Sequence, residues 1–369
     1  MRRPVTWQIT LLVLVLAVVA GAAFLVLRGR TGQSGAVDAG VEPGASVDAT
    51  RSPNPPTPFP PKGKVFLGIQ TEHGPYDFTP LSAYTEATGH RPAAFQFAQG
   101  WAHNPFDRAV FDRVAERNML PIVAWEPWDY LATGRARSHG EQPAYRLSRI
   151  AGGDFDEYIR SWAQGLKSLG YPVGMRFAHE MNGFWYPWCE QSNGNREGDY
   201  VRAYRHVHDI FRQVGVTNVI WVWSANVTYP GAEPLTGLYP GDRYVDWVGL
   251  SGYYGTAGVE RYRSFDRIFD DTLDQVRRFT RKPIVITETG ASDAEGRRAA
   301  WIREMFSQLP RHPDVIGVIW FETNKELDWR LSVTPDAARL YGEKAAAARY
   351  RVTWSTNTVP RRTVTAPRR

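Results

Sequence analysis

The sequence contains a single cysteine, Cys189, among 369 residues. One cysteine cannot form an intramolecular disulfide, so the fold must depend on its apolar core. A nucleophilic thiol would need an adjacent base, and nothing in the sequence supplies one specifically. The aromatic stretch around Cys189 instead predicts a packed or half-exposed thiol.

Metal-binding and nucleotide-binding spacings are also missing. The sequence has no HExxH and no CxxC motif, and the doublet His179-Glu180 lacks the second histidine that a zinc-binding helix needs. No glycine-rich phosphate loop follows the first apolar run, which disfavours an open nucleotide-binding sheet. We therefore expect no metal and no cofactor, and a metal-dependent barrel hydrolase is the weakest alternative.

An excess of basic residues is confined to the two ends of the chain. The formal net charge is +6, but residues 1–30 carry four arginines and residues 351–369 carry five, with no acidic residue in either segment. The part between them is slightly acidic. No aromatic and basic motif of the known nucleic-acid-binding modules is present, so we expect no nucleic-acid partner.

The N-terminal segment is predicted to be a membrane anchor. Residues 9–27 form an uncharged, mostly apolar run of nineteen residues, which is long enough to cross a bilayer as a helix. We assign residues 1–30 to an anchor or signal segment, with the following domain outside the cell membrane, or secreted if the segment is cleaved. Residues 31–63 are read as a flexible, proline-rich linker and residues 351–369 as a basic, disordered tail.

Between these segments, residues 64–350 alternate short apolar runs with amphipathic stretches. Eight apolar runs and seven helical patterns indicate an α/β protein built as one (β/α)8 TIM barrel, the single catalytic domain of the chain. The eight predicted strands cover residues 65–70, 93–99, 120–125, 172–178, 219–224, 245–252, 283–288 and 315–321.

Two glutamates stand at the ends of predicted strands. Glu180 follows the run 172–178, and Glu288 ends the run 283–288. The carboxyl ends of barrel strands converge on one face, so these carboxylates are expected to form a pair. Glycosidic bond cleavage needs such a pair: one group protonates the leaving oxygen while the other attacks or activates water. Separately, each could be a surface charge or lie near a helix N-cap.

Aromatic and polar residues gather at the same strand ends and predict a sugar-binding cleft. The sequence contains fourteen tryptophans, and flat rings with a polar edge stack well on sugars. Trp125 and Asn226 are expected to line this cleft. Arg176 should point to the same side as Glu180 by strand alternation, where it would keep a carboxylate ionised or form a structural salt bridge. The rings that follow Glu180 should raise its pKa, as a catalytic acid requires.

The segment RFAHEMNGFWYPW (176–188), together with ITETG (286–290) and WEPW (125–128), resembles glycoside hydrolase family 26, whose best-known members are β-mannanases. The resemblance implies a retaining mechanism with Glu180 as acid/base and Glu288 as nucleophile. It further implies four substrate contacts: His179 binds sugar next to the cleaved bond, Trp185 stacks at the leaving-group side, Tyr253 hydrogen-bonds the nucleophile and Trp320 forms the floor of the subsite.

Two positions depart from the mannanase pattern. Ser251 stands where mannanases commonly have an aspartate, and Phe321 stands where an arginine commonly follows the strand-eight tryptophan. We therefore expect a monomeric, endo-acting hydrolase of a β-linked polysaccharide, with β-1,4-mannan first and another β-glycan as a substrate alternative. A non-catalytic barrel that binds glycans or assists exopolysaccharide assembly is the competing function.

Overall fold

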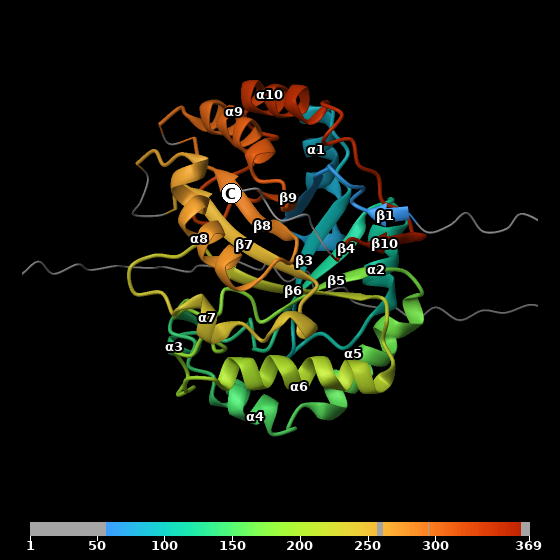
Figure 1. Cartoon of the computed structure of the whole chain (residues 1–369), viewed down its shortest axis with the longest axis vertical. Helices are drawn as coiled ribbons and strands as arrows, with labels where there is room; N and C mark the ends of the chain where they lie inside the picture. The colour runs from blue at the N-terminus through green and yellow to red at the C-terminus, as the bar shows by residue number, and fades with distance from the viewer. Residues whose placement is uncertain (1–56, 257–260, 294, 363–369) are drawn as a thin grey trace, which may run out of the picture.

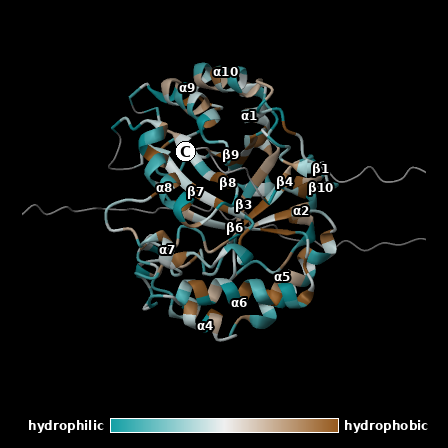
Figure 2. Cartoon of the chain, in the orientation of Figure 1, coloured by the Kyte–Doolittle hydropathy of each residue, from teal (hydrophilic) through white to brown (hydrophobic). Residues whose placement is uncertain are grey.

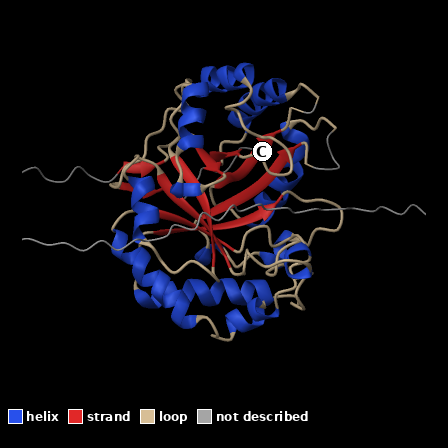
Figure 3. Cartoon of the chain, turned by 180° about the vertical axis from the view of Figure 1, so that it is seen from behind, coloured by secondary structure: helices blue, strands red, loops and turns tan. Residues whose placement is uncertain are grey.

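A computed structural model describes residues 57–256, 261–293 and 295–362. Its centre is a closed barrel of eight parallel strands surrounded by helices (Figures 1 and 3). The prediction of a (β/α)8 barrel is confirmed. In order around the barrel, the strands are β2 (Phe66–Thr71), β3 (Ala94–Gly100), β4 (Leu120–Glu126), β5 (Val173–Phe177), β6 (Val219–Asn226), β7 (Trp247–Tyr254), β8 (Ile284–Ala291) and β9 (Val315–Glu322).

The outer layer consists of amphipathic helices that bury one face against the barrel. In α6, Tyr200, Tyr204, Val207 and Phe211 recur at helical spacing and are buried, and Figure 2 shows polar and apolar patches alternating along this helix. The longer helices are α1 (Thr79–Thr88), α2 (Arg108–Ala115), α5 (Asp156–Leu169), α6 (Asp199–Val214), α8 (Phe265–Phe279), α9 (Arg298–Gln308) and α10 (Pro335–Ala345). Short turns of helix are α3 (Arg135–Ser138), α4 (Leu147–Ala151), α7 (Leu235–Leu238), η1 (Gly74–Tyr76), η2 (Pro143–Tyr145), η3 (Asp242–Tyr244) and η4 (Leu309–Arg311).

The strand pairing is irregular close to the second predicted catalytic residue. The register of β7 with β8 shifts between Leu250 and Ser251, and that of β8 with β9 shifts between Ile286 and Thr289, a stretch that contains Glu288. Irregularities of this kind bend a strand and re-aim its side chains, and they are common next to active sites. The irregularity therefore affects the direction of the Glu288 side chain.

The two ends of the folded unit pair with each other in a separate two-stranded sheet. β1 (Thr57–Phe59) lies parallel to β10 (Thr358–Pro360), and the two strands are side by side in Figure 1. Trp354 is buried with 2% of its surface exposed, and the indole N–H of Trp247 donates to the carbonyl of Arg361 at 2.6 Å.

Two predicted boundaries are therefore wrong. Residues 57–63 were expected to be linker and residues 351–362 to be disordered tail, but both segments form part of the fold. The physical reason is that the backbone groups of β1 and β10 pair with each other while Phe59 and Trp354 are buried in the core.

The predicted anchor at residues 1–30 and most of the predicted linker lie outside the described residues, as do residues 363–369. Among the residues that the structure describes, no helix has the length and apolar character needed to cross a bilayer.

Candidate active site

Glu288 lies at the carboxyl end of β8 and is held by two donors. The Arg176 guanidinium donates through Nη1 to Glu288 Oε1, and the Tyr253 hydroxyl donates to Glu288 Oε2. Tyr253 comes from β7, the neighbouring strand, so the barrel itself sets this contact. The predicted hydrogen bond between Tyr253 and Glu288 is present in the structure, and the carboxylate is fixed at both oxygens.

Arg176 is completely buried in the barrel and uses its whole guanidinium. In addition to Glu288, its Nε donates to Ser224 Oγ at 2.8 Å and its Nη2 donates to Ser251 Oγ at 2.7 Å. Nearby carboxylates, with Glu288 first, outweigh the effect of burial and raise the pKa of Arg176, so the side chain remains a cation. Sequence analysis left a choice between a side chain that keeps a carboxylate ionised and a structural salt bridge. The salt bridge to Glu288 is present, and the first role stays a prediction.

Glu180 stands on a strained turn directly after β5. Ala178 and Glu180 have positive φ angles of 46° and 54°, a region that residues with a side chain seldom occupy. The turn is held from several sides: the Glu180 N–H donates to the Ser224 carbonyl at 2.7 Å, and the Trp188 indole donates to the His179 carbonyl at 2.6 Å. Strain that is held in this way is typical of functional sites.

The Glu180 carboxyl contacts two side chains that sequence analysis placed in the site. Asn226 Nδ2 donates to Glu180 Oε1 at 3.2 Å, and Trp185 Nε1 donates to Oε2 at 3.1 Å. Burial, reinforced by the negative charge of Glu288, raises the pKa of Glu180, while Arg176 opposes the rise. The predicted direction of this pKa shift is confirmed, and the shift favours a protonated carboxyl.

His179 is buried beside Glu180, with 3% of its surface exposed. Its ring contacts those of Tyr186 and Trp188 at centroid distances of 5.1 and 5.8 Å. Burial, with the charge of Arg176 acting in the same direction, lowers the pKa of His179 well below its usual value, so the imidazole is neutral. A neutral imidazole can both donate and accept a hydrogen bond.

Trp185 is half-buried, and its ring lies next to the Glu180 carboxyl. Its ring lies over Gly183, where an added Cβ would approach the indole to 2.7 Å, and it packs near Tyr229 at 5.9 Å. Phe184 beside it is 41% exposed. This position suits a stacking role at the leaving-group side, which stays a prediction.

Two predicted substrate contacts are wrong. Trp125 is fully buried outside the barrel wall, against Trp101 and Trp162 at 4.8 and 5.1 Å. Trp320 is likewise fully buried, against Tyr341 of α10 at 5.7 Å, and its indole donates to a backbone carbonyl. Side chains alternate along a strand, so the residue following each of these tryptophans points to the other face.

Of the residues that take those places, sequence analysis noted only Phe321, as a departure from the mannanase pattern. After Trp320, Phe321 contacts the Tyr253 ring at 5.6 Å, and Trp329, from the loop after β9, contacts it at 5.0 Å. After Trp125, Glu126 is buried at the end of β4. Strand alternation could have identified Phe321 and Glu126, whereas no pattern in the sequence indicates Trp329.

Asn182 is a further positioning residue that was missed. It is fully buried, its Oδ1 accepts from the Asn226 N–H at 2.9 Å, and its Nδ2 donates to the Asn226 carbonyl at 2.9 Å. This pair of bonds ties the turn that carries Glu180 to the end of β6. Cys189, also buried, packs beneath the same turn, and burial raises the pKa of its thiol to about 12, as expected for a packed group.

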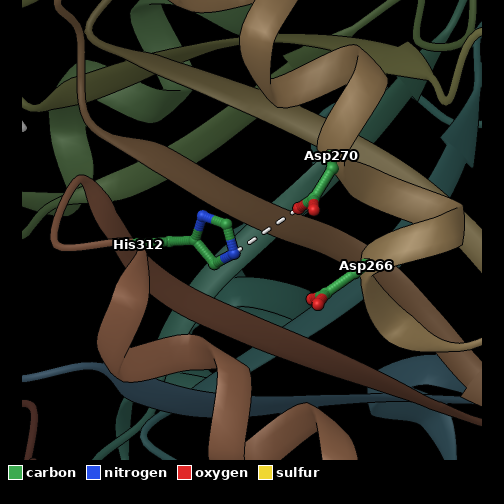
Figure 4. Close-up of side chains that lie close together, drawn as sticks. All are labelled: Asp266, Asp270 and His312. Carbon is green, nitrogen blue, oxygen red and sulfur yellow. Dashed lines mark ion pairs between the residues drawn. The ribbon is translucent and has the colours of Figure 1, made fainter. Parts of the chain in front are cut away.

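A second group of titratable side chains lies outside the barrel. Asp266 and Asp270 of α8 approach His312, which precedes β9, and their potential ligand atoms lie within 4.8 Å of one another (Figure 4). Arg277 donates to His312 Nδ1 at 3.1 Å, so the neutral ring carries its proton on Nε2, which faces Asp270 at 3.6 Å. Metal binding at Nε2 would move that proton to Nδ1, against the Arg277 guanidinium, so this contact disfavours a metal here.

Comparisons with known proteins agree with this geometry. The family described as "Glycosyl hydrolase family 26" matches residues 139–305, a range that contains both Glu180 and Glu288. Endoglucanase H of Acetivibrio thermocellus is 34% identical over 247 residues, which are 65% of this chain and 26% of that protein. The chain therefore spans about a quarter of the length of that relative.

Two further comparisons cover most of this chain and most of the protein compared with it. A mannan endo-1,4-beta-mannosidase of Bacillus subtilis is 23% identical over 73% of this chain and 75% of its own length. The solved structure of a GH26 beta-mannanase from Bacteroides ovatus superposes with a TM-score of 0.59, at 18% identity, over 79% of this chain and 90% of that one, which shows a shared fold. The resemblance to glycoside hydrolase family 26 is confirmed.

Proposed function

We propose that this chain, a relative of glycoside hydrolase family 26, is a retaining endo-acting hydrolase of a β-linked polysaccharide. One observation carries the proposal: the barrel brings together a carboxyl whose surroundings favour protonation, Glu180, and a carboxylate held by Arg176 and Tyr253, Glu288. Two carboxyl groups whose environments differ in this way can divide the roles of acid and nucleophile.

In the first step, the Glu288 carboxylate attacks the anomeric carbon of the bound sugar while Glu180 gives its proton to the departing glycosidic oxygen. This breaks the glycosidic bond and forms a glycosyl ester on Glu288. Tyr253 and Arg176 hold the attacking group in place, so little motion is needed to reach the reacting geometry. Trp185, whose indole already bonds Glu180, would stack against the leaving sugar.

In the second step, Glu180 acts as a base. It now carries a negative charge and takes a proton from a water molecule, which attacks the anomeric carbon and releases Glu288 as a carboxylate. Two inversions at the same carbon retain its configuration. His179, neutral and close to the acid, supplies a donor and an acceptor for sugar hydroxyls.

For the substrate, we propose an uncharged β-glycan, with β-1,4-mannan and β-glucan as the two candidates. The names of the relatives are divided between a mannosidase and an endoglucanase. Ser251 accepts a hydrogen bond from Arg176, and Phe321 contacts Tyr253 where mannanases commonly have an arginine. These two replacements remove polar contacts that mannanases commonly have, so β-glucan stays beside β-1,4-mannan as a candidate substrate.

The competing function is a barrel that binds glycans without cleaving them. Binding alone needs aromatic rings and hydroxyl-bonding groups, but it does not need a buried arginine that fixes a carboxylate next to an acid. The buried Arg176–Glu288 ion pair favours catalysis over binding alone, because burying two charges costs free energy and often adds little stability.

The test is an activity screen with the purified full-length protein on mannan, glucomannan, mixed-linkage β-glucan and β-1,3-xylan. Glu180→Ala and Glu288→Ala proteins run alongside, after circular dichroism shows that they are folded. We expect the wild type to release oligosaccharides from at least one polymer, and both variants to lose that activity by at least a factor of about 10³. Unchanged turnover in either variant contradicts the assignment.

A further inference from the structure

A third carboxylate, Glu126, lies at the strand ends and has no role in the two-step mechanism. It ends β4, next to the strand that leads to His179 and Glu180, and 9% of its surface is exposed, the same share as for Glu288. Burial raises the pKa of Glu126, and the negative charge of Glu288 raises it further. Glu126 therefore faces the space in which the sugar would react.

The hydrogen bonds of Glu126 are incomplete. Its Oε2 accepts from the indole N–H of Trp128 at 2.8 Å. Its Oε1 lies 4.0 Å from His179 Nδ1, which is too far for a hydrogen bond. An ionised carboxylate can accept about four hydrogen bonds, so this side chain keeps acceptor capacity on the oxygen that faces His179.

A carboxylate with so few donors is costly to bury. Burial raises the pKa of Glu126 to about 7, although the Trp128 hydrogen bond and the charge of Arg176 both act against the rise. A donor brought by a ligand would relieve this cost. Sugar hydroxyls are donors of the required kind.

A purely structural role would look different, and the same barrel provides an example. Glu322, at the end of β9, is buried with 1% of its surface exposed, and each of its oxygens accepts a backbone N–H at 2.8 Å, from Ser332 and Leu331. Glu322 thus fixes a loop with both oxygens. Glu126 fixes Trp128 with only one.

We propose that Glu126 is a substrate-binding residue whose Oε1 accepts a hydrogen bond from a hydroxyl of the sugar unit held between His179 and Glu288. The proposal rests on the proposed function and narrows its substrate. Glu126, Glu180 and Glu288 together make the subsite rich in carboxyl groups around one buried arginine. In its ionised form Glu126 adds a negative charge that would repel the carboxylate of a uronic acid, so the subsite favours uncharged sugar units.

The test compares Glu126→Gln with the matched control Glu322→Gln, on the polymer that the wild type cleaves. The glutamine can still accept from Trp128, but its amide nitrogen takes the place of the free oxygen. We expect kcat/KM for Glu126→Gln to fall about tenfold to hundredfold, mainly through KM, with little change in the unfolding midpoint. Glu322→Gln should show the reverse: a lower unfolding midpoint and unchanged KM.

A binding measurement separates this inference from the proposed function. Mannohexaose and cellohexaose are titrated calorimetrically into the Glu288→Ala protein with and without Glu126→Gln. If Glu126→Gln weakens oligosaccharide binding and the wild-type protein cleaves no polymer, the subsite is supported and the hydrolase is rejected. Normal kinetics and binding in Glu126→Gln, beside an active wild type, would overturn the inference alone. Absence of both binding and cleavage overturns both.

Discussion

Replacement of Arg176 by methionine should expose how strongly the buried ion pair supports the site. Arg176 has no exposed surface, and its partner Glu288 is 9% exposed, so the substitution leaves a carboxylate nearly buried without its cation. Breaking a buried pair in this way costs about 3 to 5 kcal/mol. The hydroxyl oxygens of Ser224 and Ser251 lose their donor as well, which adds to the cost.

A double-mutant cycle in urea measures the effect. The four proteins are the wild type, Arg176→Met, Glu288→Gln and the double variant. Removal of the second charge should recover part of the loss, so the double variant should be more stable than the sum of the single losses by about 2 kcal/mol or more. Arg339→Met is the control, because Arg339 pairs with Glu343 on the surface and should cost less than about 1 kcal/mol.

Additive losses, to within about 0.5 kcal/mol, would refute the reasoning. They would mean that Arg176 contributes through packing and its serine contacts, and that Glu288 does not depend on its charge. If Arg176→Met fails to fold, Arg176→Gln also removes the cation, with a polar side chain in its place, and allows the same cycle with Glu288→Gln.

Three further predictions follow from individual contacts. Asn226→Ala removes a donor that favours the ionised form of Glu180, so the pKa of Glu180 should rise and the alkaline limb of the kcat/KM profile should move to higher pH; a shift to lower pH contradicts this. Trp185→Ala should raise KM severalfold with little loss of stability, whereas Trp320→Ala should lower the free energy of unfolding by about 3 to 5 kcal/mol; equal effects on KM would mean that Trp320 lines the site after all. Trp354→Ala should cost a similar 3 to 5 kcal/mol in urea unfolding at unchanged kcat, and no loss of stability would mean that the C-terminal strand is dispensable.

The barrel and the pair of carboxyl groups at its strand ends could be predicted because they rest on local patterns. Each strand is a nearly continuous apolar run, which is typical of parallel strands that are buried on both faces. Glu180 stands just after such a run and Glu288 ends one, and the carboxyl ends of barrel strands meet on one face. The spacing of the chain therefore determines which residues converge.

The side on which a residue lies was harder to predict at the strand ends. Trp125 and Trp320 were assigned to the site as rings at a strand end, yet each points into the helical layer while its successor turns inward. Alternation separates neighbours within one strand, so it identifies Glu126 and Phe321 once one inward-facing residue of each strand is known.

Contacts between distant segments could not be predicted at all. β1 and β10 are three residues each and lie about three hundred residues apart, so neither has a pattern that reveals its partner. Trp329, which lies in an irregular loop, likewise contacts Tyr253 without any sequence pattern that indicates the contact. Such contacts depend on tertiary packing, which leaves no local signal.

The most direct test of the account is to find which carboxylate becomes glycosylated. The wild-type protein is incubated with an activated 2-deoxy-2-fluoro glycoside of the sugar that it cleaves, and the trapped protein is digested and mapped by mass spectrometry. The account predicts a single added glycosyl group on Glu288. A label on Glu180 or Glu126, or the absence of any covalent adduct together with inverted products, would contradict it.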